Sequence, residues 1–245
     1  MLHYLIKKSY LKDLIPDNYV DFHSHLLPGI DDGAKFEHHS VELITSLSKL
    51  GFEQFITTPH IMKNVWDNTF DSIHSKCIET KEILQNKGIE VPLKCAAEYL
   101  MDGNFSEIFK TGPLLTLKDN YVLVEMSYIN PPIQLYEILF ELQVAGYKPV
   151  LAHPERYLFF HQNFSQYEKL KNAGCLFQLN LLSTVGYYGE EVAMTAKKLL
   201  KKGLIDYVSS DVHHSNHVAA FSKKIMFKDA VALKEAFAAN TFFRF

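Results

Sequence analysis

The chain has 245 residues, of which 47% are hydrophobic and 22% charged, and its formal net charge at pH 7 is −3. This length and composition are those of a globular protein with one large domain, and the acidic balance argues against a nucleic-acid binder with a basic face. Charged residues interrupt the apolar N-terminal stretch, and no later apolar run approaches the length of a membrane span. We therefore expect no signal peptide, no membrane insertion and a cytoplasmic location.

Strand-like runs alternate with helical runs along the chain. The predicted strands cover residues 19–23, 53–57, 91–97, 121–126, 148–152, 175–179 and 205–209. The predicted helices cover residues 37–50, 67–87, 131–145, 164–172, 190–202 and 221–239. In the helix at 131–145, we expect Pro131-Pro132 to occupy the first turn, where the missing N–H costs nothing.

This alternation indicates an α/β fold, a parallel sheet with right-handed crossovers. Seven such units suit a closed or nearly closed (β/α) barrel, and a doubly wound open sheet is the alternative. Residues 1–18 lie outside the pattern, so we expect a short N-terminal extension, with a helix across the outside of a domain that spans residues 19–245.

The chain has three cysteines, Cys77, Cys95 and Cys175, without a Cys-x-x-Cys spacing. An odd number in this arrangement predicts small buried thiols in a reducing compartment and no disulfide framework.

Histidines and carboxylates recur where the predicted strands end. His23 and His25 are two residues apart, so both side chains leave the same face of the first strand. One donor follows each of five later strands, namely His60, Glu98, Glu125, His153 and Asp211. Two further donors are Asp32, in the turn Asp31-Asp32-Gly33, and His213, two residues after Asp211. Catalytic groups of barrels gather at the carboxyl ends of the strands, and a buried imidazole or carboxylate there needs a partner or a metal ion.

The mixture of nitrogen and carboxylate donors without thiolate suits Mn, Fe or Zn, and bridging carboxylates are typical of centres with several ions. The pattern therefore predicts metal-assisted hydrolysis.

These motifs carry a family resemblance. His-x-His at 23–25, Asp-Asp-Gly at 31–33, Thr-x-Pro-His ending at His60, Glu98 after Ala-Ala, His-Pro-Glu-Arg-Tyr at 153–157 and Ser-Asp-x-His ending at His213 resemble the PHP (polymerase and histidinol phosphatase) superfamily. Within it, the chain is similar to the bacterial protein-tyrosine phosphatases linked to capsule and exopolysaccharide synthesis.

The resemblance implies a distorted (β/α)₇ barrel with a trinuclear metal site. It implies that His23, His25, Glu98 and Asp211 hold one ion, that Glu98 bridges to a second ion with Glu125 and His153, and that Asp32, His60 and His213 hold a third. It also implies that the partner is a phosphotyrosine protein, a bacterial tyrosine kinase that governs polysaccharide export.

Arg156 lies three residues after His153, and a guanidinium can grip two phosphate oxygens. We predict Arg156 and Asp211 as catalytic residues; the alternative for Arg156 is a surface salt bridge with Glu155. Related enzymes often carry a second arginine shortly after Ser-Asp-x-His, where this chain has none. We predict that His217 contributes to substrate binding in its place, although an exposed loop histidine is an equal alternative.

The predicted activity is hydrolysis of a phosphomonoester, with phosphotyrosine as the expected substrate. A cysteine-based mechanism is excluded, because no arginine follows any cysteine at the Cys-x₅-Arg spacing. A histidinol-phosphate-type phosphatase and an inactive metal-binding interaction module are the alternatives. Tyr128, Tyr157 and Phe159 follow predicted strands and could border a phenyl ring, whereas Trp66 is expected in the core or at a pocket rim.

Overall fold

The computed structural model describes residues 8–245, and every strand pairing in its two sheets is parallel. The strands are β1 (Tyr19–Asp21), β2 (Phe52–Thr57), β3 (His60–Ile61), β4 (Leu93–Cys95), β5 (Glu98–Leu100), β6 (Tyr121–Glu125), β7 (Lys148–Ala152), β8 (Leu176–Asn180) and β9 (Tyr207–Ser209). The α-helices are α1 (Glu37–Ser48), α2 (Phe70–Asn86), α3 (Gly103–Thr111), α4 (Leu135–Val144), α5 (Leu158–His161), α6 (Ser165–Asn172), α7 (Glu190–Lys201), α8 (Ser215–Ala220) and α9 (Val231–Ala239). Short 3₁₀ helices are η1 (Leu11–Leu14), η2 (Pro154–Arg156), η3 (Leu181–Val185) and η4 (Asn240–Phe243).

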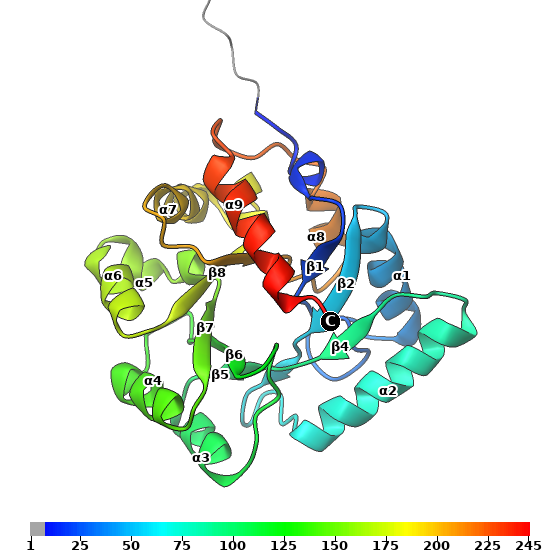
Figure 1. The fold of residues 1–245 in the computed structure, drawn as a ribbon, viewed down its shortest axis with the longest axis horizontal. Helices are drawn as coiled ribbons and strands as arrows, with labels where there is room; N and C mark the ends of the chain where they lie inside the picture. The colour runs from blue at the N-terminus through cyan, green and yellow to red at the C-terminus, as the bar shows by residue number, and fades with distance from the viewer. Residues whose placement is uncertain (1–7) are drawn as a thin grey trace, which may run out of the picture.

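The two sheets share one interior. One has the order β1-β2-β4 and the other β3-β5-β6-β7-β8-β9. The chain passes from β2 to β3 and from β4 to β5 with short interruptions, which backbone hydrogen bonds from Ala96 to Thr57 and from Glu98 to Pro59 bridge. With β2–β3 and β4–β5 each counted once, seven strand positions ring the interior, and helices cover the outside (Figure 1). The predicted α/β class is confirmed, in a seven-stranded barrel-type arrangement.

The far ends of this ring meet near the site. Ser24 forms a parallel bridge with Val212, and the backbone N–H of Asp211 donates to the carbonyl of His23. Segments that follow β1 and β9, nearly the whole chain apart in sequence, are thereby fixed side by side.

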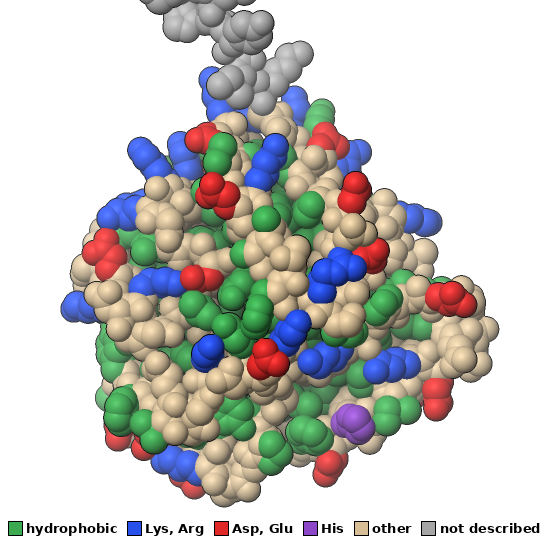
Figure 2. Space-filling model, viewed as in Figure 1, with side chains coloured by type: hydrophobic (Ala, Val, Ile, Leu, Met, Phe, Trp, Pro, Cys, Tyr) green, Lys and Arg blue, Asp and Glu red, His purple; other side chains and the backbone are tan. Residues whose placement is uncertain are grey.

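One end of the ring is closed by the C-terminal segment. Phe243 packs with inward-facing Val20, Phe22 and Val150 in a buried apolar cluster. The amide of Asn240 donates to the carbonyls of Val20 and Val208, which fixes this plug to β1 and β9. Helix α9 crosses the same end in red in Figure 1, and Figure 2 shows scattered charges there rather than the clustered histidines. The donor residues therefore lie at the opposite end of the ring, at the carboxyl ends of the strands.

The N-terminal extension packs against the domain where it is described. Leu11 and Leu14 of η1 are buried, and the backbone N–H groups of Leu11 and Lys12 donate to the carbonyls of Lys223 and Phe221. The extension thus contributes apolar contacts as one short 3₁₀ turn. The part of the predicted helix that falls on residues 1–7 lies outside the described residues.

Two helix predictions were wrong in their bounds. Helix α4 begins at Leu135, so Pro131-Pro132 precedes the first turn rather than occupying it. The predicted helix 221–239 is only α9, because residues 221–230 form turns that lead from α8. Helix α3 was missed; its start is marked by Asp102, whose side chain accepts from the backbone N–H of Phe105 as an N-cap.

The prediction of three free thiols was also wrong. Cys77 of α2 and Cys95 of β4 form a disulfide, and Cys175 is a buried free cysteine. The disulfide attaches α2 to the strand that leads into Glu98. Across residues 8–245, no helix has the length and apolar character needed to span a bilayer.

Candidate metal centre

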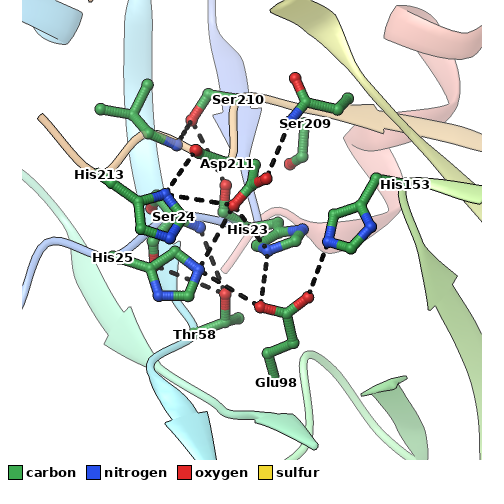
Figure 3. A network of polar contacts seen from close by, with 12 residues as sticks. His23, Ser24, His25, Thr58, Glu98, His153, Ser209, Ser210, Asp211 and His213 are labelled. Carbon is green, nitrogen blue, oxygen red and sulfur yellow. Dashed lines mark hydrogen bonds and ion pairs between the residues drawn. The ribbon is translucent and has the colours of Figure 1, made fainter. Parts of the chain in front are cut away.

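The nine predicted ligands converge at the carboxyl ends of the strands. Their donor atoms fall into overlapping groups within 4.8 Å of one another: His25, Asp32, His60 and His213; His23, Glu98 and His153; His23, His25 and Asp211; and His60, Glu98 and Glu125. In Figure 3 the imidazoles of His23, His25, His153 and His213 lie around the carboxylates of Glu98 and Asp211. The structure therefore brings together every residue that the strand-end pattern singled out.

Glu98 lies at the middle of the cluster. Its Oε2 is 3.2 Å from His23 Nε2, 3.4 Å from His25 Nε2 and 3.2 Å from His60 Nδ1. Its Oε1 is 3.2 Å from His153 Nε2. A carboxylate with histidines around both oxygens is placed to bridge neighbouring cations, as the family resemblance implied for it.

The histidines are oriented by partners outside the cluster. His23 Nδ1 donates to Gln178 Oε1 at 2.8 Å, and the Gln178 amide is held in turn by the carbonyl of Leu179. His25 Nδ1 donates to Asp31 Oδ2 at 2.7 Å. Because acceptors hold these Nδ1 atoms, the Nε2 lone pairs face the centre, which is the arrangement that supporting residues give to metal-binding histidines.

The turn after β1 depends on Asp31 and Gly33. Asp31 accepts from the backbone N–H of Gly33 at 2.9 Å and of His60 at 3.2 Å, so it fixes two donor segments. A Cβ at Gly33 would lie 2.2 Å from the carbonyl oxygen of His25. Only glycine fits this close approach, which explains the third residue of the Asp-Asp-Gly motif.

Backbone strain is concentrated at two donors. His153 and Asp211 adopt left-handed φ angles of 36° and 49°. Such angles cost energy for residues other than glycine. They persist only where contacts with the surrounding structure stabilise them. At Asp211 the preceding residue supplies the restraint, because Ser210 donates its hydroxyl and its backbone N–H to the buried Asp21 carboxylate.

The electrostatics of the cluster favour bound positive charge. Burial opposes protonation of His23, but Glu98 and Asp211 outweigh burial and raise its pKa to about 10. Burial likewise opposes protonation of His60, but Glu125 and Glu98 raise its pKa to about 9. Burial would raise the pKa values of Glu98 and Asp211, yet the histidines, His23 foremost, hold both well below their usual range. The ionised carboxylates thus stabilise positive charge next to them, on protonated histidines or on a metal ion that takes the place of those protons.

Unpaired buried atoms show that the donors fit divalent ions. Among residues 8–245, the buried side-chain atoms without a hydrogen-bond partner include His23 Nε2, His25 Nε2, His60 Nδ1, Glu98 Oε2, Glu125 Oε1 and His153 Nδ1. Buried polar groups are normally paired, so a concentration of unpaired ones at a single place points to a ligand. Nitrogen and carboxylate oxygen in this mixture suit transition-metal ions.

Arg156 lies beside the cluster rather than in a surface salt bridge with Glu155. Its Nη1 donates to Asp211 Oδ2 at 2.8 Å, and its guanidinium stacks 4.1 Å from the ring centre of Tyr188 and 4.8 Å from that of Tyr128. Glu155 is fully buried and accepts from Ser183 and Asn180 instead. Arg156 is therefore held in one plane at the edge of the site.

His217 lies outside the lining of the cavity over the donors. It is 7% exposed, its Nδ1 accepts from the backbone N–H of His213, and its ring packs against His214 and Tyr187. Its predicted substrate role stays a prediction without a contact that supports it.

A cavity of about 440 Å³ opens over the donors, within the range of small-molecule sites. Its floor is polar and is formed by Asp32, His60, Glu98, Glu125, His153, Arg156, Asp211 and His213. Its wall is mostly apolar and is formed by Met62, Val65, Trp66, Leu100, Met126, Ser127, Tyr128 and Ile129. Of the aromatics expected near a phenyl ring, Tyr128 lines the cavity, whereas Tyr157 is buried beneath it.

The residues that orient the donors escaped the sequence analysis. Gln178 and Asn180 belong to none of the motifs, and Asp31 stands in the Asp-Asp-Gly motif but was not singled out there. Asn180 Nδ2 donates to Asp211 Oδ2 at 2.8 Å. A signal was nevertheless present, because polar residues at alternate positions of a buried strand, as at 178 and 180, need partners inside the fold.

Comparison with known proteins gives consistent matches. Residues 19–227 match the family model described as capsular polysaccharide synthesis, CpsB/CapC. Tyrosine-protein phosphatase YwqE of Bacillus subtilis is 29% identical over 196 residues, 80% of this chain and 77% of that protein. Tyrosine-protein phosphatase CpsB of Streptococcus pneumoniae is 26% identical, over 80% of this chain and 83% of that protein.

Solved structures agree with these matches. One of them comes from a study of YwqE from B. subtilis and CpsB from S. pneumoniae as unique metal-dependent tyrosine phosphatases. It superposes with a TM-score of 0.76 and 28% identity, over 82% of this chain and 84% of that one. A histidinol phosphate phosphatase from Lactococcus lactis superposes with a TM-score of 0.51 at 13% identity, over 94% of this chain and 95% of that one, and shows a shared fold only.

Proposed function

The chain belongs to the CpsB/CapC family of capsular polysaccharide synthesis proteins, and on that premise we propose that it is a metal-dependent protein-tyrosine phosphatase. The observation that carries the proposal is the convergence of nine histidine and carboxylate donors, several of them buried and unpaired, beneath a cavity that also contains Arg156. Membership of the family supports the type of reaction, and the geometry of the cluster supports the choice of the residues that take part in it.

We assign three divalent ions, of Mn, Fe or Zn, to the site. His23, His25, Glu98 and Asp211 hold the first ion, Glu98 with Glu125 and His153 the second, and Asp32 with His60 and His213 the third. The overlap of the donor groups supports a centre with more than one ion, and Glu98 belongs to two of these groups. Ions in such a centre lower the pKa of bound water and offset charge on phosphoryl oxygens.

Arg156 binds the phosphate from the edge of the donor cluster. Its Nη1 is committed to Asp211, and Tyr128 and Tyr188 hold the guanidinium plane, so its remaining N–H groups are preorganised for phosphoryl oxygens. Asp211 joins the two functions, because Oδ1 faces His23 while Oδ2 accepts from Arg156. Tyrosinate, with a solution pKa of about 10, leaves more readily than an alkoxide, so little help from a general acid is needed.

The partner that we propose is a phosphotyrosine protein, namely a bacterial tyrosine kinase that governs polysaccharide export. The two proteins would interact in the cytoplasm. A histidinol-phosphate-type substrate fits less well, because every carboxylate that lines the cavity belongs to the donor set and none remains for an ammonium group. An inactive interaction module fits less well too, since all nine donors and Arg156 are kept.

Metal removal tests the proposal. EDTA should abolish hydrolysis of a phosphotyrosine peptide, and Mn²⁺ or a similar ion should restore it, with elemental analysis of the purified protein as the second measurement. Histidinol phosphate serves as the competing substrate. Full activity in protein verified to be metal-free, or preference for histidinol phosphate, would contradict the proposal.

A further inference from the structure

The cavity over the metal centre has two chemically different sides. The donors and Arg156 form the floor. The wall is contributed by Leu100 of β5 and by two loops, one after β3 that carries Trp66 and one after β6 that carries Tyr128. A phosphate bound at the floor would leave its ester group against this wall. The wall therefore contacts the part of the substrate that distinguishes one phosphomonoester from another.

Tyr128 is already engaged with protein groups. Its ring stacks on His153 with centroids 5.7 Å apart, its hydroxyl lies 3.4 Å from His153 Nε2, and the Arg156 guanidinium lies 4.8 Å from its centre. Its contacts hold members of the floor in place. It also borders the cavity, with 45% of its surface exposed.

Trp66 has no such partner. It is half-buried, it lines the cavity, and among residues 8–245 it takes part in no aromatic pair, although its surroundings are rich in aromatic and histidine rings. A large indole that faces a cavity without a stacking partner is a ready platform for an aromatic ring.

The loop that presents Trp66 is held by hydrogen bonds. The backbones of Met62 and Trp66 exchange hydrogen bonds of 3.0 and 2.8 Å, and Asn64 takes the left-handed conformation that closes the turn. The Asn68 side chain then donates to the carbonyls of Ile30 and His60, both at 2.9 Å. The loop of Trp66 is thus attached to the segments that carry Asp31 and His60.

We propose that Trp66 is the specificity-determining residue of the site, a stacking platform that selects phosphomonoesters with an aromatic leaving group. This inference rests on the proposed function for the chemistry of the floor, but it concerns a different part of the cavity. No charged group lies on the wall, so the ring that binds there is uncharged, as in a phenol ester.

Trp66 is the chain's only tryptophan, so its fluorescence reports binding directly. In the metal-loaded protein, a peptide with phosphonomethylphenylalanine, which cannot be hydrolysed, should change the emission, and methylphosphonate should leave it unchanged. Unchanged emission with a peptide that inhibits competitively would overturn the proposal.

Variants provide the second measurement. Trp66→Ala should lower kcat/KM for a phosphotyrosine peptide about ten-fold, equivalent to about 1.4 kcal/mol, while the Ki of inorganic phosphate stays within about two-fold. Trp66→Phe should keep most of the activity because it keeps a ring. Phe140→Ala, at an aromatic that is 67% exposed on α4, is the matched control and should change neither value.

The outcomes separate this inference from the proposed function. Equal losses for peptide and inorganic phosphate in both Trp66 variants, or no loss in Trp66→Ala, would assign Trp66 to structure alone and overturn the inference. If the metal-loaded protein hydrolysed no phosphotyrosine but the aryl phosphonate still changed Trp66 emission, the proposed function would fail and the aryl platform would stand.

Discussion

Replacing Arg156 tests the link between phosphate binding and the metal centre. Arg156→Ala removes a guanidinium whose side chain is 20% exposed and whose Nη1 lies 2.8 Å from Asp211 Oδ2. Asp211 keeps a second partner, since Asn180 Nδ2 donates to the same oxygen at 2.8 Å. We therefore expect the Asp211 carboxylate to stay oriented and the bound metal to be retained.

The magnitude follows from the geometry of the guanidinium. Held between Tyr128 and Tyr188, it is preorganised, and removal of one preorganised donor to a transition-state charge costs about 10²–10³-fold, or about 2.7–4 kcal/mol. Arg156→Lys should recover only part, because an ammonium supplies a point charge without the planar fork. In stability, loss of the charge-assisted hydrogen bond should cost about 1.5–3 kcal/mol.

The assay is kcat/KM on a phosphotyrosine peptide, with metal content by elemental analysis and Tm on the same samples. The matched control is Arg244→Ala, because Arg244 is the chain's only other arginine and pairs with Glu53 at the closed end of the ring. Unchanged kinetics in Arg156→Ala would refute a role in phosphate binding. Full activity in Arg156→Lys would refute the bidentate grip even if the alanine variant lost metal.

Three further changes have defined outcomes. The double variant His23→Ala/His25→Ala should lose most of kcat and have a lower metal content, while the fold persists. His74→Ala, outside the site, is the control. Near-normal turnover and metal content in the double variant would show that His23 and His25 are not ligands. Gly33→Ala should lower the free energy of unfolding by about 1–3 kcal/mol and reduce the metal content, because its Cβ would lie 2.2 Å from the His25 carbonyl oxygen. The control is Gly103→Ala, where no atom lies within 4 Å of the added Cβ, and it should change neither quantity. Equal thermal stability of the two variants would contradict the close contact at Gly33. Burial raises the pKa of Cys175 to about 12, so iodoacetamide at pH 8 should neither label the native, unreduced protein nor reduce its activity, and rapid labelling would mean that this thiol is accessible.

The strands and the donor set could be predicted from the sequence because both depend on local order. Alternating apolar runs predict parallel strands, and carboxyl ends of parallel strands meet at one edge, so donors at those ends must converge. Helix bounds were less secure: α4 starts after Pro131-Pro132 and α9 is shorter than predicted, since turns with apolar residues imitate helical spacing.

Only the tertiary structure decided how the donors are held and what else they meet. His23 is oriented by Gln178, 155 residues away, and Asp211 by Arg156 across 55 residues, and no spacing rule relates such pairs. The Cys77–Cys95 disulfide and the free face of Trp66 likewise depend on which surfaces the folded chain brings together. The sequence determined which chemical groups reach the site, because strand ends are local features; the packing of distant segments determined their orientation, charge and access.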